Sequence, residues 1–146
     1  MKILIDGDGC PVINLTIKIG KEFNKEIIIF CDTTHMIERE GATTVLVQKG
    51  VDAVDFVIAN KVGKGDIVVT QDYGLATMIL AKKAFAINQN GLIYTEDNID
   101  ELLFRRHVSK VVRKSGGKTK GPKKRSIEDD ERFERSLRKL CSNTCP

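Results

Sequence analysis

Two aspartates close to the start of the chain, Asp6 and Asp8, have the type and spacing of residues that do chemistry. They follow the apolar run 3–5, and each is followed by a glycine that lets the backbone turn tightly. Two carboxylates this close repel each other, which favours a bound cation or a shared proton. An acidic turn with a helix N-cap is the simpler interpretation. Asp55 and Asp72 are two further candidates, so the question is whether the four carboxylates meet.

The elements that must position these residues alternate between strands and helices. Compact β-branched runs predict strands, and longer stretches with an apolar stripe predict helices. Strands alternating with helices indicate βαβ units and a parallel sheet, so the expected fold class is α/β. Asn98, with Glu101 three residues on, is the expected N-cap of the fourth helix, and Ser126 with Asp129 starts the fifth. The expected strands cover 2–5, 26–31, 43–47, 66–70 and 84–87, and the expected helices cover 12–24, 52–62, 73–82, 98–113 and 126–140.

On this scaffold the acidic residues gather at one edge of the sheet. Asp6 and Asp8 follow the first strand, Asp72 follows the fourth, and Asp55 opens the helix after the third, where it would also stabilise that helix through its dipole. Ligands of open α/β sheets sit beyond the carboxyl ends of the strands, so Asn88, after the fifth strand, is an expected substrate contact. Four hard oxygen ligands suit Mg²⁺ or Mn²⁺, which activate water and neutralise phosphate charge. The four aspartates are therefore the expected metal ligands and catalytic residues of a phosphodiesterase.

Basic residues concentrate in the last third of the chain. Residues 1–104 hold 10 Lys and Arg against 15 Asp and Glu, and residues 105–146 hold 14 against 5, within a total of 24 against 20. A basic surface beside an acidic site attracts a polyanion, and nucleic acid, RNA in particular, is the expected partner. A solvated basic tail is the alternative. The expected substrate contacts in this region are Arg105, Arg106, Lys123, Lys124 and Arg125.

The composition, with 41% apolar and 30% charged residues, is the one expected of a soluble globular protein. No apolar run reaches the roughly 20 residues that span a bilayer, and Asp6 and Asp8 interrupt the only stretch that would serve as a signal peptide. We therefore expect no membrane association and a cytoplasmic location, in which the four cysteines are free thiols. The length predicts one α/β domain over residues 1–114, with a basic loop and C-terminal helix over 115–146 packed on it.

Two sets of motifs resemble known families. Residues 55–60 and 68–76 resemble the acidic helix and the Thr-x-Asp motif of PIN-domain nucleases. A closer match, over nearly the whole chain, is to the YaiI/YqxD family of bacterial proteins, a PIN-like group. That resemblance implies a three-layer α/β/α domain with a five-stranded parallel sheet in the order 3-2-1-4-5 and an additional C-terminal helix. PIN activity, where present, is cleavage of RNA with Mg²⁺ or Mn²⁺. The YaiI/YqxD-like motifs are Asp6-x-Asp8-x-Cys10-Pro11-Val12, residues 65–72 with Leu75-Ala76, Asn98-Ile99, and Gly121-Pro122 followed by Asp130 and Phe133.

Two features depart from these patterns. PIN nucleases usually add an acidic residue from an intervening helix, and here Glu38 and Glu40 are nearby without forming a clear equivalent. The run 123–125 is also more basic than expected after Gly-Pro, which would add to nucleic-acid affinity.

Two other functions compete for the same residues. In a haloacid-dehalogenase-type phosphatase, Asp6 would be the nucleophile and Asp8 the general acid. That mechanism needs a second acidic pair, but Asp66 and Asp72 flank one strand at opposite ends and lie too far apart to share an ion. A non-catalytic module is the third interpretation, in which the carboxylates hold a structural cation and the basic region binds RNA.

Overall fold

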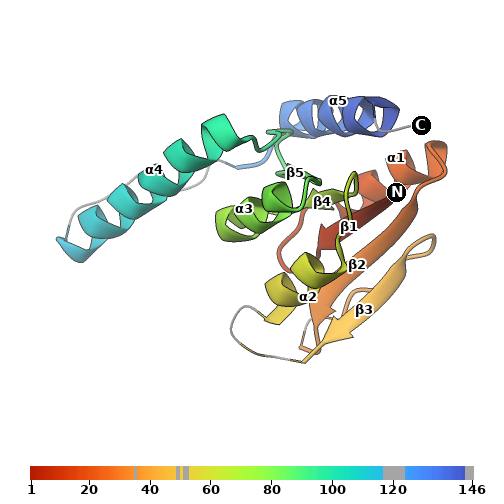
Figure 1. The fold of residues 1–146 in the computed structure, drawn as a ribbon, viewed down its shortest axis with the longest axis horizontal. Helices are drawn as coiled ribbons and strands as arrows, with labels where there is room; N and C mark the ends of the chain where they lie inside the picture. Colours follow the sequence, from red (N-terminus) through yellow and green to blue (C-terminus); the bar gives the residue numbers. More distant parts are fainter. Residues whose placement is uncertain (35, 49, 51–52, 117–123, 144–146) are drawn as a thin grey trace.

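The fold is a five-stranded, all-parallel sheet with helices on both faces (Figure 1). The structure, a computed structural model, describes residues 1–34, 36–48, 50, 53–116 and 124–143. The strands are β1 (Lys2–Asp6), β2 (Glu26–Asp32), β3 (Thr43–Val47), β4 (Ile67–Val69) and β5 (Phe85–Ile87). Their order across the sheet is β3-β2-β1-β4-β5, which confirms the α/β class and the predicted 3-2-1-4-5 order.

Five helices are described, and each predicted helix is present. They are α1 (Ile13–Glu22), α2 (Ala53–Lys61), α3 (Tyr73–Ala81), α4 (Glu96–Lys114) and α5 (Ile127–Asn143). None of these helices is both long enough and apolar enough to cross a membrane.

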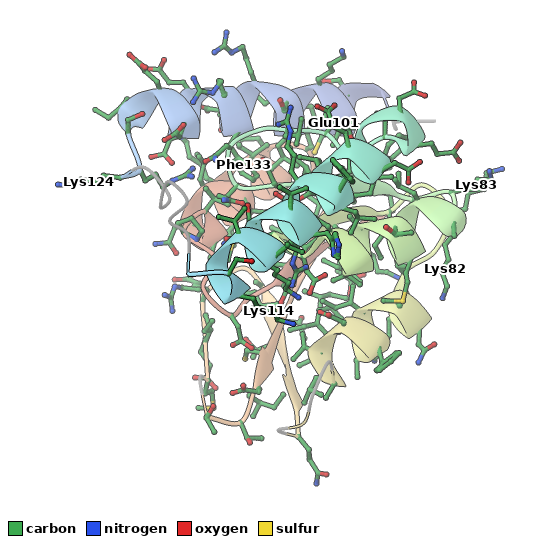
Figure 2. All side chains as sticks on the ribbon, turned by 90° about the vertical axis from the view of Figure 1, so that its left-hand side faces the viewer. Lys82, Lys83, Glu101, Lys114, Lys124 and Phe133 are labelled. Carbon is green, nitrogen blue, oxygen red and sulfur yellow. The ribbon has the colours of Figure 1, made fainter. Side chains whose placement is uncertain are left out.

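Alternate side chains of β1 face two separate cores, as the period of a strand requires. Ile3 and Ile5 pack with α1 and α5, whereas Leu4 packs with α2, α3 and the start of α4. Phe133 belongs to α5 and is fully buried; in the view of Figure 2 its label lies just below that helix, on the side of the sheet. Helix α1 approaches β2 so closely that a Cβ added to Gly20 would lie 2.6 Å from the Ile27 side chain. The two cores hold β1 at the centre of the sheet, and with it the acidic residues at its end.

The C-terminal helix α5 packs against α1 on the first of these cores. Its apolar side, predicted from the spacing of Phe133, Leu137 and Leu140, is buried there together with Cys141. Cys10, Cys31 and Cys141 are free thiols. Residues 117–123 of the predicted basic loop, and Cys145, lie outside the described residues.

One predicted helix start is wrong, and another agrees with the structure. Helix α4 begins at Glu96, because Thr95 and not Asn98 caps it: the Asn98 N–H donates to the Thr95 hydroxyl, and the Thr95 N–H donates to the Asn98 side chain. Asn98 is thus the returning member of a capping box that starts three residues earlier. At α5 the Ser126 N–H donates to Asp129, and the Asp129 N–H donates to Ser126, as predicted.

Candidate functional site

The candidate site lies at the carboxyl ends of β1 and β4, the two neighbouring strands at which the strand order of the sheet reverses. From β1 the chain moves outward to β2 and β3 on one side, and later to β4 and β5 on the other, so β1 and β4 flank the switch point at which open α/β sheets bind ligands. Asp6 is the last residue of β1, and Asp72 caps α3 directly after β4. Parallel pairing of Ile5 with Val69 aligns the ends of the two strands. The two aspartates therefore lie side by side although 66 positions separate them.

Thr70 joins the two aspartates. Its hydroxyl donates to Asp6 Oδ2 at 2.9 Å and accepts the backbone N–H of Asp72 at 3.0 Å. Asp72 Oδ1 in turn accepts the N–H of Leu75 at 3.0 Å, which is the N-cap bond of α3. Thr70 is itself only 2% exposed, and its carbonyl accepts the hydroxyl of Tyr94 at 3.2 Å. Part-buried hydrogen bonds thus hold both carboxylates in position.

The turn that carries Asp8 is held to the sheet on two sides. The Gly7 N–H donates to the Phe30 carbonyl at 2.8 Å, which continues the β1–β2 ladder one residue past Asp6. A Cβ at Gly7 would lie 2.8 Å from that same oxygen, so only glycine allows this approach. On the other side, Gln71 Nε2 donates to the Gly9 carbonyl at 3.0 Å. Asp8, between these two bonded glycines, lies close enough to Asp6 for its charge to raise the pKa of the Asp6 carboxyl.

A cavity of about 790 Å³ opens over these residues, and its lining carries both signs of charge. Three carboxylates, those of Asp6, Asp8 and Asp72, belong to it. Helix α4 supplies the opposite wall, with its cationic side chains. Such a cavity has an acidic floor for a cation and a basic wall for an anion. The remaining lining residues include Gln71, Tyr73, Leu102 and Ser109, and the cationic ones are Arg105, Arg106 and Lys110.

The electrostatics of Asp6 reflect this crowding. Burial is the largest influence and raises the pKa of its carboxyl from 3.8 to about 6. The hydrogen bond from Thr70 lowers the pKa, and the charges of Asp8 and Asp72 raise it further. Ionised Asp6 is therefore unfavourable by itself and becomes favourable beside a cation, which is the electrostatic condition of a metal site.

The donor set fits a hard divalent cation. Mg²⁺ is typically held by one or two carboxylates, with water and substrate phosphate completing its shell, and three carboxylates share this cavity. Among the described residues, no group of three or more His, Cys, Asp or Glu side chains is already arranged to hold an ion.

The other predicted site residues do not line this cavity. Asp55 lies in the first turn of α2 and is absent both from the lining and from the charges that act on Asp6. The side-chain oxygen of Asn88 accepts the N–H groups of Asn90 and Leu92, both at 2.9 Å, so it holds its own turn together. A role for Asp55 or Asn88 in binding stays a prediction.

Lys124 and Arg125, the described basic residues before α5, also lie apart from the cavity lining. Arg125 bonds Asp130 at 2.6 Å, Asn90 at 2.8 Å and the Gln89 carbonyl at 2.7 Å, so it ties the start of α5 to the turn after β5. Lys124 is exposed (Figure 2), and Lys123 lies outside the described residues. Of the four predicted substrate-contacting cations that the structure describes, Arg105 and Arg106 line the cavity.

Asp66, the residue on which the phosphatase interpretation depended, lies at the opposite end of β4 from Asp72. It is 4% exposed, and its two oxygens accept the N–H groups of Lys2 at 2.9 Å and Gly63 at 2.8 Å. Its side chain also pairs with Lys2 Nζ at 3.6 Å. Asp66 therefore fastens the start of β1 to the start of β4, away from the cavity.

Sequence reasoning missed Thr70 and Gln71 as parts of the site. Both lie between β4 and Asp72, and only the paired strands show that Thr70 reaches Asp6 and that Gln71 reaches Gly9. The available signal was the Thr-x-Asp motif. Its threonine hydroxyl donates to the Asp6 carboxylate and accepts the backbone N–H of Asp72.

Comparison with known proteins places the chain among close relatives. Residues 4–143 match the family described as "Uncharacterized BCR, YaiI/YqxD family". The chain is 54% identical over 140 residues to a UPF0178 protein of Exiguobacterium sibiricum, with 96% of each chain covered. It is 52% identical over 143 residues to a UPF0178 protein of Clostridium kluyveri, covering 98% of this chain and 94% of that one. A UPF0178 protein of Clostridium tetani is 50% identical, with 94% of each covered. No solved structure gives a significant match.

Proposed function

The chain belongs to the YaiI/YqxD family, and from its cavity we propose that it is a divalent-metal-dependent nuclease that hydrolyses RNA phosphodiesters. The observation that carries this proposal is the pairing of three carboxylates with three cations across one cavity at the switch point of the sheet. A phosphodiester needs both, because its attack requires an activated water and its negative charge must be neutralised.

The roles follow from the positions of the side chains. Asp6 and Asp72 would be the principal ligands of Mg²⁺ or Mn²⁺, since Thr70 holds both in place. Asp8 would hold a second ion or orient water, and Asp55 is the fourth acidic candidate. When bound, the ion supplies the activated water and part of the positive charge at the phosphate. Thr70 keeps the carboxylates in register, and it contacts only protein groups.

The wall formed by α4 favours a polymer over a small phosphate ester. Arg105, Arg106 and Lys110 follow one another along the helix, so they can bind phosphates on either side of the one that reacts. Backbone contacts of this kind carry no base specificity, and we expect binding that weakens with salt and tolerates sequence.

The test offers purified protein single-stranded RNA, single-stranded DNA and a phosphomonoester in parallel, with Mn²⁺ or with chelator. We expect RNA cleavage that needs Mn²⁺ and is lost in Asp6→Asn and Asp72→Asn. Asp97→Asn, an exposed α4 carboxylate outside the cavity lining, is the matched control and should retain activity.

Three results would contradict the proposal. Hydrolysis of the monoester alone, lost in Asp6→Asn, would identify a phosphatase. Salt-sensitive RNA binding without turnover of any substrate would identify a binding module. RNA cleavage that survives both Asp6→Asn and Asp72→Asn would mean that the cavity is not its source.

A further inference from the structure

Helix α4 has an apolar face that nothing in the described part of the chain covers. Phe104 is 66% exposed, Val108 is 42% exposed and Val111 is 49% exposed. Their spacing of four and three residues puts them on one side of the helix. Helix α4 packs chiefly on α3, through its first turns, and its second half extends beyond the body of the domain (Figure 1). Three large apolar side chains in a row on an exposed helix indicate an interaction surface.

This apolar face is not the one that lines the cavity. At 100° per residue, Phe104 lies about 160° around the helix from Arg106, and Val111 lies about 160° from Ser109. Arg106 and Ser109 line the cavity. A substrate in the cavity would therefore leave the apolar face uncovered.

The charges along α4 are divided between its two halves. Residues 96–103 contain four Asp and Glu and no Lys or Arg, whereas residues 104–114 contain five Lys and Arg and no Asp or Glu. Figure 2 shows Glu101 nearer the start of the helix and Lys114 at its far end. Asp97, Asp100 and Lys114 are all exposed. The helix thus carries a negative half, a positive half and an apolar stripe that begins where they meet.

We propose that the protein forms a two-fold symmetric dimer in which α4 packs antiparallel against α4 of a second copy. Centred near His107, this pairing sets Phe104 against the partner's Val108 and the partner's Val111. It also brings Asp100 close to the partner's Lys114, and by symmetry Lys114 close to the partner's Asp100. The dimer lies on the side of α4 away from the cavity, so it stands independently of the proposed function.

A second copy fits this face better than other occupants do. An isologous interface must be self-complementary, and a helix with one acidic and one basic half meets that condition only when it is reversed. The 19-residue helix is about 28 Å long, which offers less contact than a standard interface, so we expect a weak dimer with a dissociation constant on the order of 10 μM.

The first test is sedimentation of the full chain over a range of concentrations. Wild type should change from monomer to dimer, and Phe104→Glu should raise the dissociation constant at least about tenfold, because it places a charge in the apolar contact of both copies. Phe56→Glu is the matched control, since Phe56 on α2 is 58% exposed and away from α4. A strictly monomeric wild type, or a dimer that Phe104→Glu leaves intact, would overturn the proposal.

The second test exchanges the charges. Asp100→Lys and Lys114→Glu should each weaken self-association by roughly three- to tenfold, because each places like charges opposite one another. An equimolar mixture should restore it, since the lysine introduced in the first variant then meets the glutamate introduced in the second. If the mixture associates no more tightly than either variant alone, the antiparallel arrangement is overturned. If Phe104→Glu weakens RNA binding and leaves the mass unchanged, the face belongs to RNA and the dimer proposal fails.

Discussion

The same chemical substitution should have opposite effects on stability at the two ends of the central strands. Asp6 lies at the carboxyl ends of the central strands and Asp66 at their amino ends, and replacing either by asparagine removes one negative charge. At Asp6 the charge is unfavourable because of burial and the two carboxylates nearby. At Asp66 both oxygens accept backbone N–H groups, so an amide there would set a donor against a donor.

The magnitude at Asp6 follows from its pKa. A rise from 3.8 to about 6 corresponds to roughly 3 kcal/mol of unfavourable ionisation at neutral pH. This rise is already net of the Thr70 hydrogen bond, which favours the ionised carboxylate. Asp6→Asn should therefore stabilise the metal-free protein by about 3 kcal/mol and raise its melting temperature by roughly 6 to 12 °C. Asp66→Asn should destabilise it by about 1 to 3 kcal/mol.

The pH dependence gives the sharper test. Because the pKa of Asp6 is higher in the folded than in the unfolded state, the folded state binds more protons between pH 3.8 and about 6. Its contribution to stability is therefore lost as the pH rises through this window. The advantage of Asp6→Asn should be absent at pH 4 and complete by pH 7.

The assay is urea unfolding of wild type, Asp6→Asn and Asp66→Asn in chelator at pH 4 and pH 7. A destabilised Asp6→Asn at pH 7, or a difference from wild type that is equal at the two pH values, would refute this account of the carboxylate. An Asp66→Asn variant with the same free energy of unfolding as wild type would refute the structural role given to that residue.

Further predictions concern the parts of the site. Thr70→Val should destabilise the protein by about 1 to 3 kcal/mol in urea unfolding, because the part-buried N–H of Asp72 loses its acceptor; unchanged stability would contradict the bridging role. Millimolar Mn²⁺ should stabilise wild type by about 2.7 kcal/mol at a hundredfold excess over the dissociation constant and so raise its melting temperature, but should leave the melting temperatures of Asp6→Asn and Asp72→Asn unchanged. Equal shifts in all three would place the ion elsewhere. Arg106→Ala and Lys110→Ala should each reduce the salt dependence of RNA binding by about 0.7 in the log–log slope, with Lys139→Ala on α5 as the control. A slope that changes only in the control would exclude α4 as the RNA-binding wall.

The sheet was predictable from sequence because its strands are compact apolar runs. Residues 3–5 and 27–31 cannot form an amphipathic helix, and a strand buried on both faces needs no alternation. Family resemblance supplied the strand order, which local pattern does not contain. The start of α4 was wrong because Thr95 and Asn98 are both good capping residues, and only the pair of hydrogen bonds between them shows which is the N-cap.

The candidate site was predictable where it depended on strand ends. Asp6, Asp8 and Asp72 meet because parallel strands end at the same edge. Local hydrogen bonds decided the rest: Asn88 and Arg125 have the right type and an approximate position, yet their own turn and helix start engage them. Which cations face the cavity depends on the rotation of α4, which its buried Ile99 sets. The PIN-like relationship stays a prediction.

The position of β1 has a consequence for the newly made chain. Among the described strands of the sheet β1 is made first, and it lies in the middle; its second neighbour, β4, follows about 64 residues later, which is the separation of the bonded pair Lys2 and Asp66. At 5 to 20 residues per second, that interval is roughly 3 to 13 seconds. Throughout this interval β1, whose central residues Ile3 to Ile5 are apolar, keeps one edge open, and an open edge pairs readily with other chains. Overexpression should therefore meet aggregation at this stage of synthesis, and slower translation at lower temperature would lengthen the exposure as well as weaken the apolar attraction behind it.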